Sequence, residues 1–401
     1  MTTQVFGEVR PGFEAVADEF SRNFEKRDEL GAACCIYVDG EKVADLWGGL
    51  RDRETRAPWE KDTMVCVFSA TKGMSALALA LAHSRGLIDY EQRVCTYWPE
   101  FAQQGKERIT VRQLLSHQAG LFALDAPVDR SVIEDLDQLA TVLAAQKPEW
   151  EPGSRQAYAM IALGFYEGEL LRRVDPLHRS LGQYFQDEIA TPLGLDFYIR
   201  VPAAIPNTRL ATINDLNLLR ALPILARISL PLLLSGLNPG SALRRSDRNP
   251  GSNVVIDPDT VYLREVEVPA GGGVGTARAM ARAYSEFATG GHELGLRSET
   301  LRALMAPARP PRHGFYDESL KVTWQLSLGF LKSCPGYWLF GSPDAFGMPG
   351  WGGSFAFADP ETRLGYAYVM NRVGPPGPAD KRDSALRAAL NRCLGLKEKA
   401  A

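Results

Sequence analysis

The chain has 401 residues, 45% of them hydrophobic, which is enough to bury a large core and exceeds the length of one typical domain. Its 45 Lys and Arg residues nearly balance its 48 Asp and Glu residues, so the formal net charge is −3 at pH 7. This balance excludes the strongly basic surface that nucleic-acid-binding proteins use, and we expect no nucleic-acid partner.

Two segments of the sequence bear on secretion and on membrane insertion, residues 1–11 and residues 216–237. Residues 1–11 contain no basic region followed by an apolar run, so we find no secretory signal and expect a cytoplasmic protein. The most apolar stretch, 216–237, contains two arginines and two prolines, so we expect no integral membrane span. It is interpreted either as a lid or surface helix pair, or as two buried helices broken at proline. The sequence does not indicate an oligomeric state.

Apolar periodicity predicts the elements in chain order. A helix over 12–28 precedes a hairpin over 31–46, whose turn is Asp39-Gly40. The middle of the chain is then mainly helical, and strand patterns return late, before a final helix over 379–394. The predicted middle helices are 69–85, 110–118, 134–146, 158–174 and 180–190, and the predicted late strands are 322–331, 337–340, 354–358 and 364–370.

The distribution of these elements predicts two domains. Strands come from both ends of the chain and helices from the middle. We therefore expect an α/β domain built from residues 1–66 and 260–401, with a mainly helical domain of residues 67–259 inserted. Residues 210–258 are a candidate lid within the second domain.

Ser69 and Lys72 form the one Ser-x-x-Lys sequence in the chain, and they precede an apolar helical run. Residues three apart share a helix face, so the hydroxyl and the amine are expected to lie together. Burial lowers the pKa of a lysine, and a neutral amine can take the proton of a serine nucleophile. The N–H groups at the helix N-terminus suit a developing oxyanion. On these residues alone, an N-cap serine and a solvated lysine remain an alternative.

Five further segments, taken with residues 68–72, resemble one known superfamily. In this order along about residues 12–394 they match the serine β-lactamase and penicillin-binding-protein superfamily and, within it, the class C-like branch that contains the family VIII carboxylesterases. The resemblance implies a β-lactamase/transpeptidase-like fold of the α/β (α+β) class, an antiparallel sheet flanked by helices with an inserted all-helical domain. The five segments are 109–121, 150–158, 192–195, 271–278 and 346–360.

The resemblance also implies roles for individual residues. Ser69 is the expected nucleophile that forms an acyl-enzyme, and Lys72 and Tyr158 are the expected coupled base. Lys72 beside Tyr158 is expected to favour the phenolate, which would relay a proton to the leaving group and later activate water. The backbone N–H groups of Ser69 and Trp351 are the expected oxyanion hole. His117 is expected to be structural, capping a turn through its ring.

Two motifs depart from the family pattern. Met160 stands where the family has the Asn of its Tyr-x-Asn motif, and methionine cannot replace the amide hydrogen bonds. Met348 begins the segment that aligns with Lys-Thr-Gly, although a register that begins at Trp351 is an alternative. Without a cation there, a substrate carboxylate lacks its partner. The expected substrate-binding residues are Met160, Met348, Gly350, Trp351 and Gly352.

These residues together predict a serine hydrolase that cleaves small-molecule carboxylic esters of small to medium acyl chain. A β-lactamase, a D-alanyl peptidase, an amide hydrolase or an acyltransferase remains an alternative, as does a non-catalytic binding module. The chain has no Gly-x-Ser-x-Gly elbow, which argues against a Ser-His-Asp hydrolase. Its five histidines lack metal-ligand spacing, so no metal and no cofactor are expected.

Overall fold

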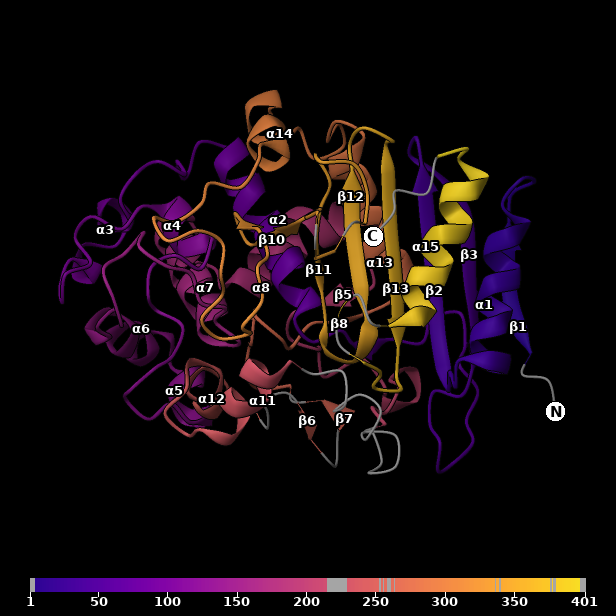
Figure 1. Ribbon diagram of the computed structural model, residues 1–401, viewed down its shortest axis with the longest axis horizontal. Helices are drawn as coiled ribbons and strands as arrows, with labels where there is room; N and C mark the ends of the chain where they lie inside the picture. The colour runs from indigo at the N-terminus through magenta and orange to yellow at the C-terminus, as the bar shows by residue number, and fades with distance from the viewer. Residues whose placement is uncertain are drawn as a thin grey trace.

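The computed structural model of the protein combines a large sheet, which lies toward the right of Figure 1, with a block of helices beside it. The two ends of the chain meet in the sheet layer. The structure describes residues 4–214, 229–251, 254, 256–257, 261–262, 264–335, 337–338, 340–375, 377 and 380–396.

The sheet has eight strands, and every neighbouring pair is antiparallel. The N-terminal hairpin joins the C-terminal strands through a seven-residue ladder in which Cys35 pairs with Ala367. In spatial order the strands are β1 (Val5–Val9), β3 (Glu41–Gly49), β2 (Gly31–Val38), β13 (Leu364–Met370), β12 (Phe355–Asp359), β11 (Phe346–Pro349), β10 (Phe330–Lys332) and β9 (Leu326–Ser327).

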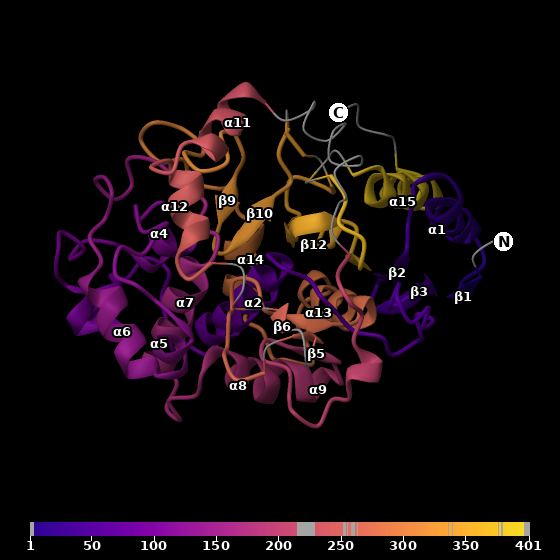
Figure 2. The same cartoon turned by 90° about the horizontal axis from the view of Figure 1, so that it is seen from below.

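Helices cover both faces of this sheet. α13 (Ala277–Ala288) packs against β2, β12 and β13, whereas α1 (Glu14–Lys26) and α15 (Lys381–Cys393) pack together over the opposite face (Figures 1 and 2). Alternation along β13 supplies both cores, because successive strand residues point to opposite faces. Tyr366 and Tyr368 belong to the core beneath α1 and α15, and Ala367 belongs to the core with α13.

The helical block surrounds α2 (Ala70–Ser84), every residue of which is buried. Small and apolar side chains on all its sides allow α2 to pack against α7, α8, α14 and β11 at once. The other helices of the described residues are α3 (Val94–Tyr97), α4 (Val111–Leu115), α5 (Arg130–Glu134), α6 (Leu136–Ala145), α7 (Ala162–Val174), α8 (Leu181–Phe185), α9 (Thr191–Leu193), α11 (Leu230–Leu237), α12 (Ala242–Arg248) and α14 (Ser298–Met305).

Short elements link these layers. A three-stranded sheet in the order β4, β8, β5 lies beside the start of α2, and a two-stranded hairpin pairs β6 with β7. The bounds are β4 (Val65–Cys66), β5 (Phe197–Tyr198), β6 (Ile256–Asp257), β7 (Val261–Tyr262) and β8 (Val274–Gly275), with 3₁₀ turns η1 (Pro99–Phe101), η3 (Asn207–Arg209) and η5 (Trp351–Gly353) and a π-helical turn η2 (Gln186–Ala190).

The predicted fold class, an antiparallel sheet flanked by helices, is confirmed, and so is the hairpin over 31–46. The helix predicted over 158–174 begins only at Ala162. The strand predicted over 322–331 is a hairpin of β9 and β10, because Leu328 and Gly329 both have positive φ and reverse the chain. In the described part of 337–340, Trp338 forms one isolated bridge with Cys334 and no strand.

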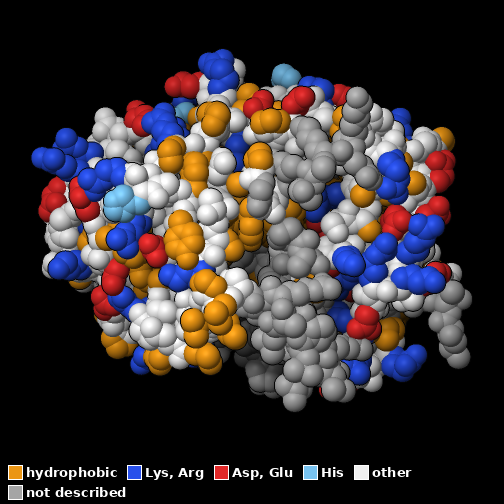
Figure 3. All heavy atoms as spheres, in the orientation of Figure 1, with side chains coloured by type: hydrophobic (Ala, Val, Ile, Leu, Met, Phe, Trp, Pro, Cys, Tyr) orange, Lys and Arg blue, Asp and Glu red, His pale blue; other side chains and the backbone are white. Residues whose placement is uncertain are grey.

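The apolar stretch 216–237 is described only in part, since residues 215–228 lie outside the described residues. Its end forms α11, whose leucines Leu230, Leu233, Leu234 and Leu237 are exposed. Figure 3 shows apolar side chains grouped on the face where α11 lies. None of the described helices is long and apolar enough to cross a bilayer. The lid and the two-domain division stay predictions.

Candidate active site

The chain turns sharply from β4 into α2 at the predicted nucleophile. Phe68 has a positive φ of 48°, and Ser69 is the half-buried N-cap residue of α2. The Ser69 side chain makes no capping hydrogen bond to the helix, so its hydroxyl is available to other groups. Thr71 braces the turn, because its hydroxyl donates to the Phe68 carbonyl and accepts the Gly273 N–H at 2.9 Å.

The Lys72 side chain is fully buried and contacts three oxygen atoms. Its Nζ lies 3.2 Å from Ser69 Oγ, 2.6 Å from the Met160 carbonyl and 2.9 Å from the Ala270 carbonyl. Burial lowers the pKa of Lys72 to about 7, and the negative charge of Glu167 opposes this shift. A neutral amine can donate two N–H groups to the two carbonyls and keep its lone pair for the Ser69 hydroxyl.

Tyr158 lies beside both Lys72 and Ser69. Its ring centroid is 4.7 Å from Lys72 Nζ, and a hydrogen bond to Ser69 lowers the pKa of its phenol. Burial outweighs that hydrogen bond and raises the pKa, aided by the charges of Asp317 and Glu167. The resting side chain is therefore a protonated phenol, contrary to the expectation of a phenolate, because Tyr158 has lost its water shell.

Two residues distant in sequence hold the segment that carries Tyr158. The His117 ring accepts the Ala159 N–H at 3.0 Å through Nδ1, and the His117 carbonyl accepts the Ala157 N–H at 3.1 Å. Asp317 accepts the backbone N–H of Tyr158 at 2.9 Å. Burial, with Lys72 nearby, keeps the pKa of His117 well below its usual value, so the ring is neutral. This geometry fits the structural role expected for His117.

The third-motif strand meets the start of α2 at Gly350. A Cβ on Gly350 would lie 2.0 Å from the Val67 carbonyl oxygen and 3.3 Å from the Ala70 nitrogen, so only glycine permits this approach. Within the described part of the chain, the N–H groups of Ser69 and Trp351 donate to no protein oxygen. Both N–H groups are thus available to a ligand. The register of the third motif, from Met348 or from Trp351, stays a prediction.

The other predicted substrate-binding residues differ in exposure. The Trp351 side chain is 55% exposed and Met160 is half-buried, so both can reach a ligand. Met348 is fully buried, and a Cβ on Gly352 would lie 3.0 Å from Met370 Cε and 3.2 Å from the Val373 α-carbon. Substrate contact by Met348 and by the Gly352 α-carbon therefore stays a prediction.

Sequence reasoning missed three contributors to this site. The carbonyls of Met160 and Ala270 bind the Lys72 amine, yet a backbone oxygen leaves no mark on residue type. The glycine-rich segment 271–278 was the one signal near Ala270. Nothing in the sequence singled out Asp317, which has a buried carboxylate. Among the described residues, no group of three or more His, Cys, Asp and Glu side chains could hold a metal ion.

Comparison with known proteins identifies the family of the chain. The protein-family model described as Beta-lactamase matches residues 17–391. The chain is 34% identical over 374 residues to esterase/beta-lactamase LipL of Mycobacterium tuberculosis, covering 93% of this chain and 84% of LipL. It is 35% identical to a family VIII carboxylesterase structure, with a TM-score of 0.83 over 98% of this chain and all of the other.

A second solved structure, EstA from Arthrobacter nitroguajacolicus Rue61a, is 31% identical with a TM-score of 0.80, covering 98% of this chain and 99% of EstA. The family match extends over far more than half of the chain, and the similarity to LipL includes nearly all of it. The predicted resemblance is confirmed: the chain belongs to the Beta-lactamase family, a serine hydrolase family with esterase members.

Proposed function

We propose that this protein is a carboxylesterase that cleaves esters of small to medium acyl chain through an acyl-enzyme on Ser69. The observation that carries the proposal is the contact of Ser69 Oγ with Lys72 Nζ at 3.2 Å, inside a site that brings the pKa of the amine to about 7. The names of the relatives, esterase LipL, a family VIII carboxylesterase and EstA, support the ester as the substrate class.

In the proposed acylation, the neutral Lys72 amine takes the Ser69 proton while Oγ attacks the ester carbonyl carbon. The carbonyl π electrons move to oxygen, and the N–H groups of Ser69 and Trp351 stabilise the oxyanion. The oxyanion then collapses and the C–O bond to the alcohol breaks. The alkoxide takes the phenol proton of Tyr158, which is replaced by a proton from the Lys72 ammonium.

Deacylation reverses these roles with water in place of the alcohol. Water attacks the acyl carbon and gives its proton to the Lys72 and Tyr158 pair. The bond from the acyl carbon to Oγ breaks, Ser69 regains its proton, and the carboxylic acid leaves. A protonated Tyr158 at rest suits this scheme, because a phenol can donate to the alkoxide and need not start as a base.

The chemistry of the site favours uncharged, apolar substrates. The third-motif strand carries Met348 where relatives of the penicillin-binding type have a cation, and Met160 presents a thioether in place of an amide. The exposed Trp351 ring offers an apolar wall. A carboxylated substrate would bring a negative charge into this site without a partner, which costs several kcal/mol.

β-Lactam hydrolysis is the second candidate, because the relative LipL is named both an esterase and a beta-lactamase. The same acyl-enzyme could form on a β-lactam carbonyl. The apolar third motif argues that this activity is the weaker one.

The test is turnover of a p-nitrophenyl acyl-chain series beside nitrocefin, with wild type and Ser69→Ala. We expect ester turnover that Ser69→Ala lowers by at least about 10³-fold, and little nitrocefin cleavage. Nitrocefin cleavage without ester turnover would contradict the carboxylesterase proposal and favour a β-lactamase. Activity on neither substrate, with Ser69 unreactive to a phosphonate, would favour a non-catalytic module.

A further inference from the structure

Glu167 of α7 is a fully buried carboxylic acid that the mechanism above does not use. Both of its carboxyl oxygens are buried, and neither has a hydrogen-bond partner within the described part of the chain. An unpartnered buried carboxylate is costly, so such a group is rare in folded proteins. The other buried carboxylates described above are anchored: Asp317, for example, accepts four N–H groups.

The position of Glu167 links it to Lys72. A Cβ on Gly329, in the turn between β9 and β10, would lie 2.6 Å from the Ala76 Cβ and 3.3 Å from Glu167 Oε1. The carboxyl group therefore borders α2 at Ala76, one helical turn beyond Lys72 and on the same face. The turn that closes this space is fixed by the Gly329 N–H, which donates to the Leu115 carbonyl at 2.8 Å.

Electrostatics couple the two groups. Burial raises the pKa of Glu167 to about 8, and the positive charge of Lys72 opposes that shift. In turn the charge of Glu167 opposes the lowering of the Lys72 pKa. Groups coupled in this way titrate as a pair, so the charge state of one depends on the other.

We propose that Glu167 is a positioning residue for the reaction, the buried acidic partner that sets the fraction of Lys72 able to accept the Ser69 proton. This inference rests on the proposed role of Lys72 as base. Glu167 does not touch the nucleophile or the substrate, and it acts only through the charge it places behind α2. When the carboxylate is ionised it favours the Lys72 ammonium, and when it is protonated it leaves the amine free to act.

Two further titratable groups, His117 and Tyr158, lie near Lys72, and a third, Asp317, binds the backbone of Tyr158. His117 lies in the segment after α4, Tyr158 in the segment before α7, and Asp317 in the segment before β9. Burial keeps His117 neutral and Tyr158 protonated near neutral pH. Burial also raises the pKa of Asp317 above its usual value, and its carboxylate accepts N–H groups from Tyr158, Ser319, Leu320 and Trp324.

The test is the pH dependence of kcat/KM for a p-nitrophenyl ester with wild type and Glu167→Gln. Without the carboxylate, Lys72 loses a group that favours its protonated form. The acidic limb is therefore expected to move to lower pH by on the order of one unit. The plateau is expected to fall a few-fold because a weaker base accepts the proton less readily, and KM is expected to stay unchanged. An acidic limb that stays in place or moves to higher pH would overturn the proposal.

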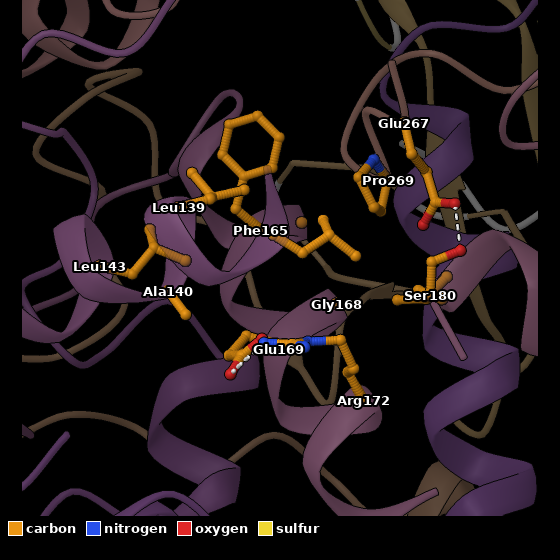
Figure 4. Close-up of a pocket in the computed structure, with 13 residues that line it drawn as sticks. Leu139, Ala140, Leu143, Phe165, Gly168, Glu169, Arg172, Ser180, Glu267 and Pro269 are labelled. Atoms are coloured by element: carbon orange, nitrogen blue, oxygen red, sulfur yellow. Dashed lines mark hydrogen bonds and ion pairs between the residues drawn. The ribbon is translucent and has the colours of Figure 1, made fainter. Parts of the chain in front are cut away.

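Glu267→Gln is the matched control. Glu267 is a half-buried carboxyl whose pKa is also raised by desolvation, but it accepts from Ser180 Oγ at 2.7 Å and from the Gly182 N–H at 2.8 Å. Figure 4 shows Glu267 and Ser180 joined at a pocket lined by α6 and α7, and neither Ser69 nor Lys72 lines that pocket. This variant is expected to keep the wild-type acidic limb, so an equal shift in both variants would contradict the assignment.

Two further readouts separate the possible failures. The rate at which a phosphonate labels Ser69 depends on the same Lys72 titration and needs no ester turnover. If a phosphonate labels wild type but wild type does not hydrolyse the ester, only the proposed function is contradicted. Because the Glu167 oxygens have no partner, Glu167→Gln and Glu167→Met are expected to unfold at a temperature no lower than wild type. Failure of both variants to fold would show a purely structural role and overturn the proposal.

Discussion

A single buried amine, that of Lys72, lies at the centre of the proposed active site. The Ser-x-x-Lys spacing at a helix start predicted that Ser69 and Lys72 lie together, because residues three apart share a helix face, and the family resemblance implied their roles. The environment of Lys72 could not be predicted in the same way. The Met160 and Ala270 carbonyls reach it from segments far along the chain, and the direction of a carbonyl depends on tertiary structure. Met160, which stands where the family has Asn, thus contacts Lys72 through its main-chain carbonyl.

The pH dependence of ester hydrolysis is predicted by this environment. Burial brings the pKa of Lys72 to about 7, and only the neutral amine can accept the Ser69 proton. We expect kcat/KM to rise with pH through about 7 and to reach a plateau above it. A pH profile of wild type checks this, with Lys72→Arg, which stays protonated, as the inactive control. A flat profile through neutrality would exclude Lys72 as the titrating base.

The free energy of unfolding should also depend on pH through Lys72. The sign of this dependence is opposite to that for a lysine in a salt bridge, because burial lowers the Lys72 pKa. The folded-state pKa of Lys72, about 7, lies below the value of 10.5 for an ordinary lysine, so the unfolded chain binds the extra proton between these values. The free energy of unfolding therefore gains a contribution from this group as pH rises above about 7. Urea unfolding of wild type and Lys72→Met at several pH values isolates the Lys72 contribution. The same slope of unfolding free energy against pH in both proteins would refute this prediction.

The segment between residues 156 and 161 is the element that orients Tyr158. Helical periodicity predicted a helix from residue 158, but α7 begins at Ala162 because outside groups bind the preceding backbone N–H groups. His117 and Asp317 supply those groups from segments about 40 and 160 residues away. Secondary-structure propensity includes only interactions between residues close in sequence. It therefore cannot predict a helix start that is fixed by distant side chains.

Asp317→Asn is predicted to loosen this element. The carboxylate accepts the N–H groups of Tyr158, Ser319 and Leu320 and the indole N–H of Trp324, and an amide would turn an NH₂ group toward some of these donors. We expect a loss of about 2–3 kcal/mol in unfolding free energy and a lower kcat with the ester.

Glu318→Gln is the control for this substitution. The Glu318 carboxylate is adjacent in sequence to Asp317 but forms only partly exposed ion pairs, with Arg155 and Lys321. Its removal should change stability by no more than about 1 kcal/mol. Chemical denaturation and ester kinetics of the two variants decide the matter. Asp317→Asn with the stability and kcat of Glu318→Gln would show that Asp317 does not hold the Tyr158 segment.

Across the whole molecule, residues from the two ends of the chain contact the turn that borders the candidate active site. Arg382 at the start of α15 pairs with Glu29 at 3.1 Å and with Asp380 at 2.6 Å, and it donates to the Gly352 carbonyl at 2.9 Å. The turn that carries the Trp351 N–H is thus tied to both terminal segments. Strands at both ends of the sequence predicted an α/β domain built from both termini, and the family resemblance implied the fold class. Neither predicted this junction of Glu29, Arg382 and Gly352, because the order of strands fixes no side-chain contact.

Arg382→Met is expected to destabilise the protein by about 3–5 kcal/mol, because Glu29 and Asp380 would remain buried without their partner. Activity at a temperature where the variant is folded should also fall, since the Gly352 turn loses a donor. Arg363→Met, which removes an exposed ion pair with Asp39, should cost no more than about 1 kcal/mol. Thermal and urea unfolding compare the two, and similar midpoints would contradict this role of Arg382.

The acyl-enzyme on Ser69 is the central claim, and mass spectrometry of the quenched enzyme tests it most directly. Wild type mixed with an activated ester and stopped by acid should carry one acyl group, located on the peptide that contains Ser69, and Ser69→Ala should carry none. Ester turnover by Ser69→Ala at the wild-type rate, or an acyl group located on another residue, would contradict the account.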